Sequence, residues 1–93
     1  MIKNQFLSEK ILQTTHYSNG QLALFVEDDN GEPIAELSIM HDPVELASDE
    51  FILKDYSENK QIAQIFFESG AIVPTNRFVL IGSHLCLVCQ IKS

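Results

Sequence analysis

Alternating apolar and polar residues on both sides of Asn30-Gly31 predict a β-hairpin. Asn-Gly is the strongest short signal for a two-residue type I′ turn, in which both central residues adopt positive φ. If the chain folds there, every cross-strand pair on one face is apolar, so the pattern and the turn agree on the register. The predicted pairs are Val26–Ala35, Leu24–Leu37 and Leu22–Ile39.

Two further strands are predicted on either side of this hairpin. Residues 10–17 are rich in β-branched and aromatic side chains, which favour strands. Gly20 can adopt the left-handed conformation that a tight return requires, so these residues and the hairpin make a three-stranded meander. Residues 41–50 are expected to form an acidic loop, and residues 51–56 a short fourth strand.

A single helix is predicted near residues 57 to 69. Ser57 is a suitable N-cap, and the charge of Glu58 complements the positive end of the helix dipole. Gly70 is expected to end the helix, and Pro74 prevents it from resuming. The apolar residues at helical spacing are Ile62, Ala63, Ile65 and Phe66.

The C-terminal residues 77–92 predict a second hairpin with Gly82-Ser83 at its turn. Alternation along the strands places six apolar side chains on one face. These are Phe78, Leu80, Leu85, Leu87, Cys89 and Ile91. The whole pattern predicts one α+β domain over residues 1–93. Its antiparallel sheet has five to six strands (meander, short strand, helix, C-terminal hairpin), with one helix packed on one face.

Acidic side chains are concentrated in one third of the chain. The formal net charge is −7, whereas residues 27–58 hold eleven acidic residues against Lys54 alone, a net charge of −10. Phosphate-rich nucleic acids are bound by Lys and Arg, and anionic membranes attract the same cations. Direct nucleic-acid and membrane partners are therefore not expected.

The stretch "HLCLVC" at residues 84–89 raises the question of a metal or redox site. Side chains three positions apart in a strand point to opposite faces, so Cys86 and Cys89 would not converge on one ion. A redox pair needs a helix N-terminus, which an apolar strand does not offer. Packing accounts for both cysteines, although His84 and Cys86 share a face and could supply two ligands. We expect no metal and no cofactor.

Other patterns bear on location and catalysis. The sequence has no apolar run of about 18 residues and no signal-peptide core. With two cysteines and no disulfide framework, the chain is expected in the reducing cytoplasm. It lacks a nucleophile elbow and the glycine-rich loops that hold nucleotides. No catalytic residue can be assigned, and enzymatic activity is not expected.

Three segments, in this order and spacing, resemble a small bacterial family called domain of unknown function 4313. They are NGQLALFVEDDNGEPIAELSI, DEFILKDYSENKQI and ESGAIVPTNRFVLIGSHLCLV, within residues 16–89. The chain departs from the family pattern at Gln61 and Asn76, where glycine is expected. The resemblance implies an origin on phages, plasmids or integrated elements, and it supplies no catalytic residue.

Two functional hypotheses follow from charge and resemblance. The first is a small, acidic, non-enzymatic binding protein of a mobile element. It would inhibit a host defence nuclease, in the manner of an anti-CRISPR protein, by occupying a basic nucleic-acid-binding surface. The alternative is an accessory protein-interaction domain with no inhibitory role.

The residues assigned to partner binding in the first hypothesis are ten of the eleven acids of residues 27–58. They are Glu27, Asp28, Asp29, Glu32, Asp42, Glu45, Asp49, Glu50, Asp55 and Glu58. Tyr56, Asn59 and Arg77 form an alternative recognition patch. Together with Asp55, these three residues could instead cap the helix and tie the loop at residues 74–77 to it.

Overall fold

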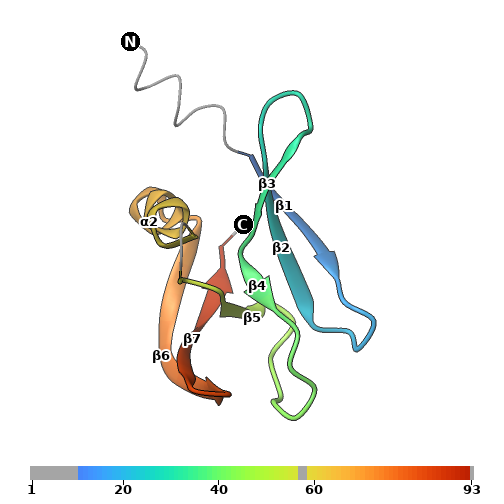
Figure 1. Cartoon of the computed structure of the whole chain (residues 1–93), viewed down its shortest axis with the longest axis vertical. Coiled ribbons are helices and arrows are strands. Elements are labelled where there is room, and N and C mark those ends of the chain that lie inside the picture. Colours follow the sequence, from blue (N-terminus) through green and yellow to red (C-terminus); the bar gives the residue numbers. More distant parts are fainter. Residues whose placement is uncertain (1–10, 57–58, 93) are drawn as a thin grey trace.

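The α+β class is confirmed in a computed structural model that describes residues 11–56 and 59–92 (Figure 1). The described residues form one helix and seven antiparallel strands. The strands belong to two sheets, whereas one sheet of five to six strands was predicted. The first sheet has the order β1-β2-β3 and the second the order β4-β5-β7-β6. The elements are β1 (Ile11–His16), β2 (Leu22–Glu27), β3 (Pro33–Glu36), β4 (Ser38–Ile39), β5 (Glu50–Leu53), α2 (Asn59–Ser69), β6 (Ile72–Ile81) and β7 (His84–Ile91).

The turn between β2 and β3 differs from the predicted type I′ turn. Val26 pairs with Ala35 as predicted, but only Gly31, with φ +82°, has a positive φ in this turn. Residues 28–32 connect the two strands, and the backbone N–H of Asp28 donates to the carbonyl of Glu32. The Asp28 carboxylate accepts from the N–H groups of Asn30 and Glu32, both at 2.9 Å. These two hydrogen bonds from the backbone to the Asp28 side chain favour right-handed conformations at the first loop residues and a left-handed conformation at Gly31.

Leu37 is the residue at which the chain passes from one sheet to the other. Its N–H donates to the carbonyl of Leu24 in β2, and its carbonyl accepts from Lys54 just after β5. Beyond Leu37 the chain continues as β4, where Ile39 pairs with Ile52. The predicted Leu22–Ile39 pair is therefore wrong, because the strand leaves β2 before reaching Leu22.

Helix α2 closes the larger core from one side. Ala63 and Phe66 are buried against a cluster that includes Leu24, Phe51 and Cys89. Gly70, at φ +82°, ends the helix as predicted: its N–H donates to Phe67, and the next N–H donates to Phe66. The Ser57 cap and Glu58 lie outside the described residues.

The C-terminal hairpin is confirmed, with Ile81 paired to His84 across Gly82-Ser83. The predicted six-residue face is divided. Leu87, Cys89 and Ile91 belong to the core cluster beneath α2. In contrast, three apolar side chains nearer the turn are exposed. They are Phe78 (57% exposed), Leu80 (65%) and Leu85 (63%).

The position of α2 explains this division. Figure 1 shows α2 beside the end of β6 that is remote from the β6–β7 turn. The eleven-residue helix therefore covers only one end of the hairpin. On the other face of the hairpin, Cys86 and Val88 form a second cluster with Ile52, and Val44 and Leu46 from the 41–49 loop pack against it. One face of the hairpin is thus covered by the loop, and the other is partly bare.

Candidate interaction surfaces

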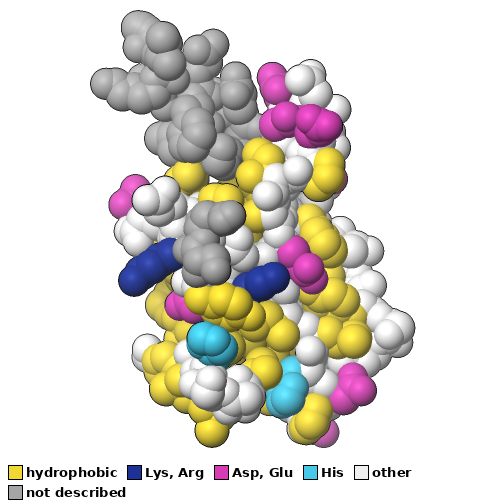
Figure 2. All heavy atoms as spheres, viewed as in Figure 1, with side chains coloured by type: hydrophobic (Ala, Val, Ile, Leu, Met, Phe, Trp, Pro, Cys, Tyr) yellow, Lys and Arg dark blue, Asp and Glu magenta, His cyan; other side chains and the backbone are white. Residues whose placement is uncertain are grey.

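The acidic residues of the β2–β3 turn and those of the 41–49 loop lie at two different ends of the molecule. Glu27, Asp28, Asp29 and Glu32 lie at the β2–β3 turn. The 41–49 loop is held at the opposite end of β2, where Gln21 binds the backbone carbonyls of His41 and Val44. Six strand residues, or about 20 Å, separate the two ends. Figure 2 likewise shows acidic side chains at the top of the molecule and others towards the bottom. The charged segment is not one continuous patch.

Several acids form hydrogen bonds that hold the fold. Asp28 organises the β2–β3 turn, and Asp49 accepts from the Gln90 side chain at 3.0 Å. Glu50 accepts from the backbone of Ala47 and from the Arg77 guanidinium, both at 2.9 Å. Asp29, Glu32, Asp42 and Glu45 are exposed, and Asp55 is half-buried just after β5. Glu58 lies outside the described residues.

The three residues of the alternative patch have separate roles. The Asn59 side chain is buried, and its amide donates to the carbonyls of Glu36 (2.7 Å) and Lys54 (3.0 Å). The Tyr56 ring stacks on His84, with ring centroids 4.7 Å apart. The Arg77 guanidinium contacts Glu50 and, at 3.0 Å, the carbonyl of Glu45. Asn59 therefore ties the helix start to strand ends, while Arg77 secures the acidic loop rather than the helix.

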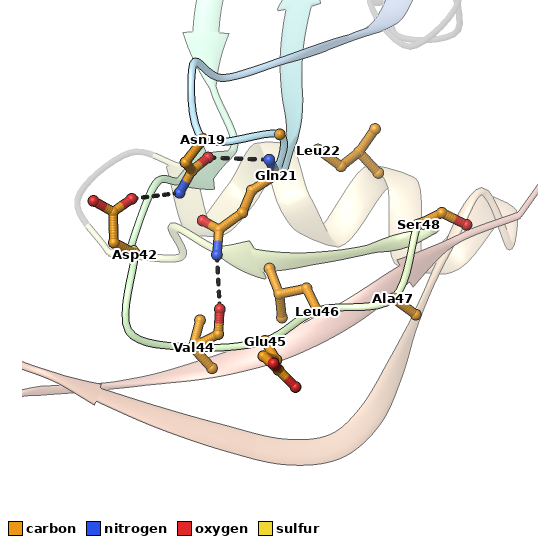
Figure 3. Close-up of a pocket in the computed structure, with 10 residues that line it drawn as sticks. Asn19, Gln21, Leu22, Asp42, Val44, Glu45, Leu46, Ala47 and Ser48 are labelled. Atoms are coloured by element: carbon orange, nitrogen blue, oxygen red, sulfur yellow. Dashed lines mark hydrogen bonds between the residues drawn. The ribbon is translucent and has the colours of Figure 1, made fainter.

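A hollow of about 560 Å³ lies between the β1–β2 turn and the acidic loop (Figure 3). Its polar groups mostly hold the loop in place. The Asn19 side chain donates to Asp42 at 2.7 Å, and the Gln21 side chain also accepts from the N–H of His41 at 2.9 Å. The ionisable side chains in its lining are Asp42 and Glu45, both exposed.

The cysteines occupy opposite faces of β7, as alternation predicts. Cys89 belongs to the core cluster beneath α2 and Cys86 to the second cluster, and both thiols are free. Burial raises the pKa of Cys89 to about 12, and the negative charge of Asp55 adds to this rise. Burial, followed by the same charge, raises the pKa of Cys86. Within residues 11–56 and 59–92, no group of three or more His, Cys, Asp or Glu side chains is placed to hold a metal ion.

The exposed apolar side chains of the C-terminal hairpin make a surface that the sequence pattern did not reveal. Phe78, Leu80 and Leu85 are here called the hairpin face. Leu80 is directly opposite Leu85, and Phe78 is directly opposite Leu87, so these side chains adjoin across the two strands. Figure 2 shows hydrophobic side chains gathered at the lower left, where Figure 1 places the β6–β7 hairpin. The sequence feature that could have indicated this surface is the length of the apolar face predicted for the C-terminal hairpin. That face is longer than an eleven-residue helix can cover.

Comparisons with protein-family models, curated proteins and solved structures found no match to this chain. The resemblance to domain of unknown function 4313 therefore stays an expectation, as does the cytoplasmic location. No helix in the described part of the chain has both the length and the apolar character needed to cross a membrane.

Proposed function

We propose that this chain is a non-enzymatic binding domain that contacts another protein chain through the hairpin face. The observation that carries the proposal is the exposure of three adjoining large apolar side chains on two strands. Single exposed apolar residues are ordinary on protein surfaces, whereas adjoining ones are typical of interaction sites. Within residues 11–56 and 59–92, the other exposed large apolar residues are Ile11, Ile34, Met40 and Tyr56, all outside β6 and β7.

The distribution of charge supports the same surface. Residues 69–93 contain no Asp or Glu, although the chain as a whole carries −7. Charged side chains are depleted at the centre of protein interfaces because removing them from water costs free energy. Phe78, Leu80 and Leu85 thus lie in a segment without acids, and Asp55, just after β5, is an acid from elsewhere in the chain whose charge acts on Cys86 and Cys89 of β7.

Capture of partners by matched variants tests this function. Leu80→Lys places a charge on the hairpin face, and Ile34→Lys places the same charge on β3 at a residue that is 40% exposed. Each tagged chain is incubated with lysate of the organism that encodes it. Partners captured by the parent and by Ile34→Lys, but lost by Leu80→Lys, support the proposal. Equal capture by all three chains contradicts it, provided that all three melt at similar temperatures.

The inhibitor hypothesis is retained as a second candidate function. Its support is the lack of neutralising cations: Arg77–Glu50 is the single ion pair within residues 11–56 and 59–92. The exposed acids could therefore compete with phosphates for the basic nucleic-acid-binding surface of a host defence nuclease. Because the acids lie at two ends, we propose that one end makes the contact.

Two double variants distinguish the ends. Asp29→Asn with Glu32→Gln removes two of the four negative charges at the β2–β3 turn, and Asp42→Asn with Glu45→Gln removes two of the three in the 41–49 loop. Binding through one end predicts slower association for one pair only, together with weaker binding as added salt screens the charges. If both double variants bind a nuclease partner as fast as the parent at low salt, charge mimicry is excluded.

A further inference from the structure

We propose that the 41–49 loop is a strap that opens as one unit while both sheets stay folded. Its opening uncovers an apolar face of the second sheet. Because side chains alternate along a strand, that face lies on the side of β6 and β7 opposite the hairpin face. The proposal concerns a movement within the chain, and it does not depend on a partner at the hairpin face.

An apolar row crosses the second sheet beneath the loop. Ile39 pairs with Ile52, Ile52 with Val88, and Val88 with Arg77, so these four side chains lie on one face. Ile52 and Val88 are fully buried. In the described part of the chain, the apolar side chains that pack on them from outside this sheet belong to the 41–49 loop. The loop is therefore what shields this row from water.

The loop is a shallow cover. Each of its residues is exposed or half-buried, and its apolar contacts with the row come from Val44 and Leu46, which are half-buried. Its backbone hydrogen bonds are short turns, in which the N–H of Val44 donates to His41 and the N–H of Glu50 donates to Ala47. Segments with little buried surface and no ladder of backbone hydrogen bonds open at lower free energy than core strands.

Side chains at its two ends hold the loop closed. At one end, the Gln21 side chain donates to the carbonyl of His41 and accepts from the N–H of the same residue, both at 2.9 Å. At the other end, the Glu50 carboxylate accepts from the N–H of Ala47 and from the Arg77 guanidinium, also at 2.9 Å. Gln21 directly precedes β2 of the first sheet, whereas Arg77 lies on β6 of the second. The loop thus spans two anchors on different sheets.

A strap with two anchors predicts coupling between its ends. If the loop opens as one unit, weakening either anchor raises the open population at both ends. The N–H groups of His41 and Ala47, each bonded to a side-chain oxygen, report the two ends. The buried N–H of Leu24, bonded to the Ser38 hydroxyl, reports opening of the sheets themselves.

Native-state hydrogen exchange of these three amides, followed by NMR at low urea concentrations, tests the proposal. In the parent chain, the amides of His41 and Ala47 should open at lower free energy than that of Leu24. Their opening should also depend less on urea, because opening the loop exposes little surface. Arg77→Met should speed exchange at His41, the far end, by at least about threefold. Lys60→Met, which removes the same charge from an exposed position of α2, should leave that exchange unchanged.

Gln21→Ala is the reciprocal variant and should speed exchange at Ala47, again at the far end. Acceleration confined to the end next to each substitution would show that the two ends open independently, which overturns the single strap. The proposal also fails if His41, Ala47 and Leu24 share one free energy of opening and one urea dependence in the parent chain. The loop would then open only when the whole chain unfolds.

Uncovering of the apolar row is measured with Val88→Cys, which places a thiol beneath the loop. An uncharged thiol reagent is applied below the unfolding transition, and fragmentation mass spectrometry locates the label. The thiol at position 88 should react at least about threefold faster when Arg77→Met is added, while the rate at Cys89, on the other face of β7, stays unchanged. An unchanged rate at position 88 would show that the loop does not uncover the row, and would overturn that part of the proposal.

Discussion

The side-chain oxygen of Ser38 accepts a hydrogen bond from the backbone N–H of Leu24, at 2.8 Å. The carbonyl of Leu24 accepts a hydrogen bond from the N–H of Leu37, whereas the carbonyl of Leu37 accepts one from the N–H of Lys54 and not from Leu24. The second bond of the expected backbone pair is therefore absent, and the serine hydroxyl replaces it. Ser38 is only 1% exposed, so no water is available for this N–H. One hydroxyl thus permits the chain to pass between the two sheets.

Replacing Ser38 by alanine should destabilise the fold. The substitution leaves a buried N–H without an acceptor and removes a partner of the Tyr17 hydroxyl, 2.8 Å away. We expect the free energy of unfolding to fall by about 2–3 kcal/mol, measured by urea denaturation. Ser48→Ala, at an exposed loop position, should change it by less than about 0.5 kcal/mol. Equal stability of the two variants would contradict this account.

Tyr17 should make the fold sensitive to alkali. Its hydroxyl donates to the Glu36 carboxylate, and burial followed by this bond raises the pKa of Tyr17 from 10.0 to about 12. The folded state favours the protonated phenol, so this contribution to stability is complete below about pH 10 and is lost as the pH rises towards 12. Between about pH 10 and pH 12, the Tyr17→Phe variant should therefore lose less stability than the parent chain. Melting temperatures of both chains, measured as a function of pH, test this. An identical alkaline slope in both chains would contradict the prediction.

Local sequence patterns predicted the helix end and the positions of the hairpin turns well, because the conformation of such a segment depends mainly on residues that are neighbours in the sequence. The helix end at Gly70 and the turn at Gly82-Ser83 follow from glycine conformations, and both are observed. The type I′ turn was wrong because the Asp28 carboxylate binds two backbone N–H groups, a contact that the Asn-Gly pattern does not encode. A left-handed backbone also occurs at Asn76, with φ +70°, where asparagine is tolerated in place of glycine.

Tertiary arrangement was less predictable. Alternation correctly places Phe78 and Leu80 on one face with Leu87, but it does not reveal how far a covering element extends. The hairpin face therefore emerged only from the position of α2. Similarly, the continuous charge of residues 27–58 is divided in space, because β2 separates the turn from the loop. Sequence proximity is a poor guide to surface proximity where a strand intervenes.

The two cysteines should behave as packing residues. Both are buried and have raised pKa values, so little reactive thiolate is present at pH 8 and reagents reach it slowly. A thiol-specific reagent should label the folded chain slowly and both cysteines rapidly in urea, while Ser83→Cys in the exposed turn labels fast. Metal analysis of chain purified without chelator should find no stoichiometric zinc. One tightly bound zinc per chain, or rapid labelling of the folded parent, would overturn this interpretation.

Asn59 should tolerate substitution least among the polar residues of the helix. Its amide faces two backbone carbonyls, so Asn59→Asp replaces two donated hydrogen bonds by a carboxylate directed at two oxygen atoms. We expect a loss of more than about 3 kcal/mol at pH 7. The fold disfavours the ionised aspartate and so raises its pKa. The loss relative to the parent should therefore shrink as the pH falls through that raised value, because a protonated carboxyl can donate one bond.

Gln61→Glu is the matched control for Asn59, because it introduces the same charge at an exposed position of α2. Its free energy of unfolding should differ from that of the parent by less than about 0.5 kcal/mol at pH 7. Urea denaturation of both variants at pH 7 and pH 4 separates the buried contact from a general effect of added charge. If Asn59→Asp is as stable as Gln61→Glu at pH 7, the Asn59 contacts do not hold the helix to Glu36 and Lys54. Asn59 would then be available to the recognition patch with Tyr56 and Arg77.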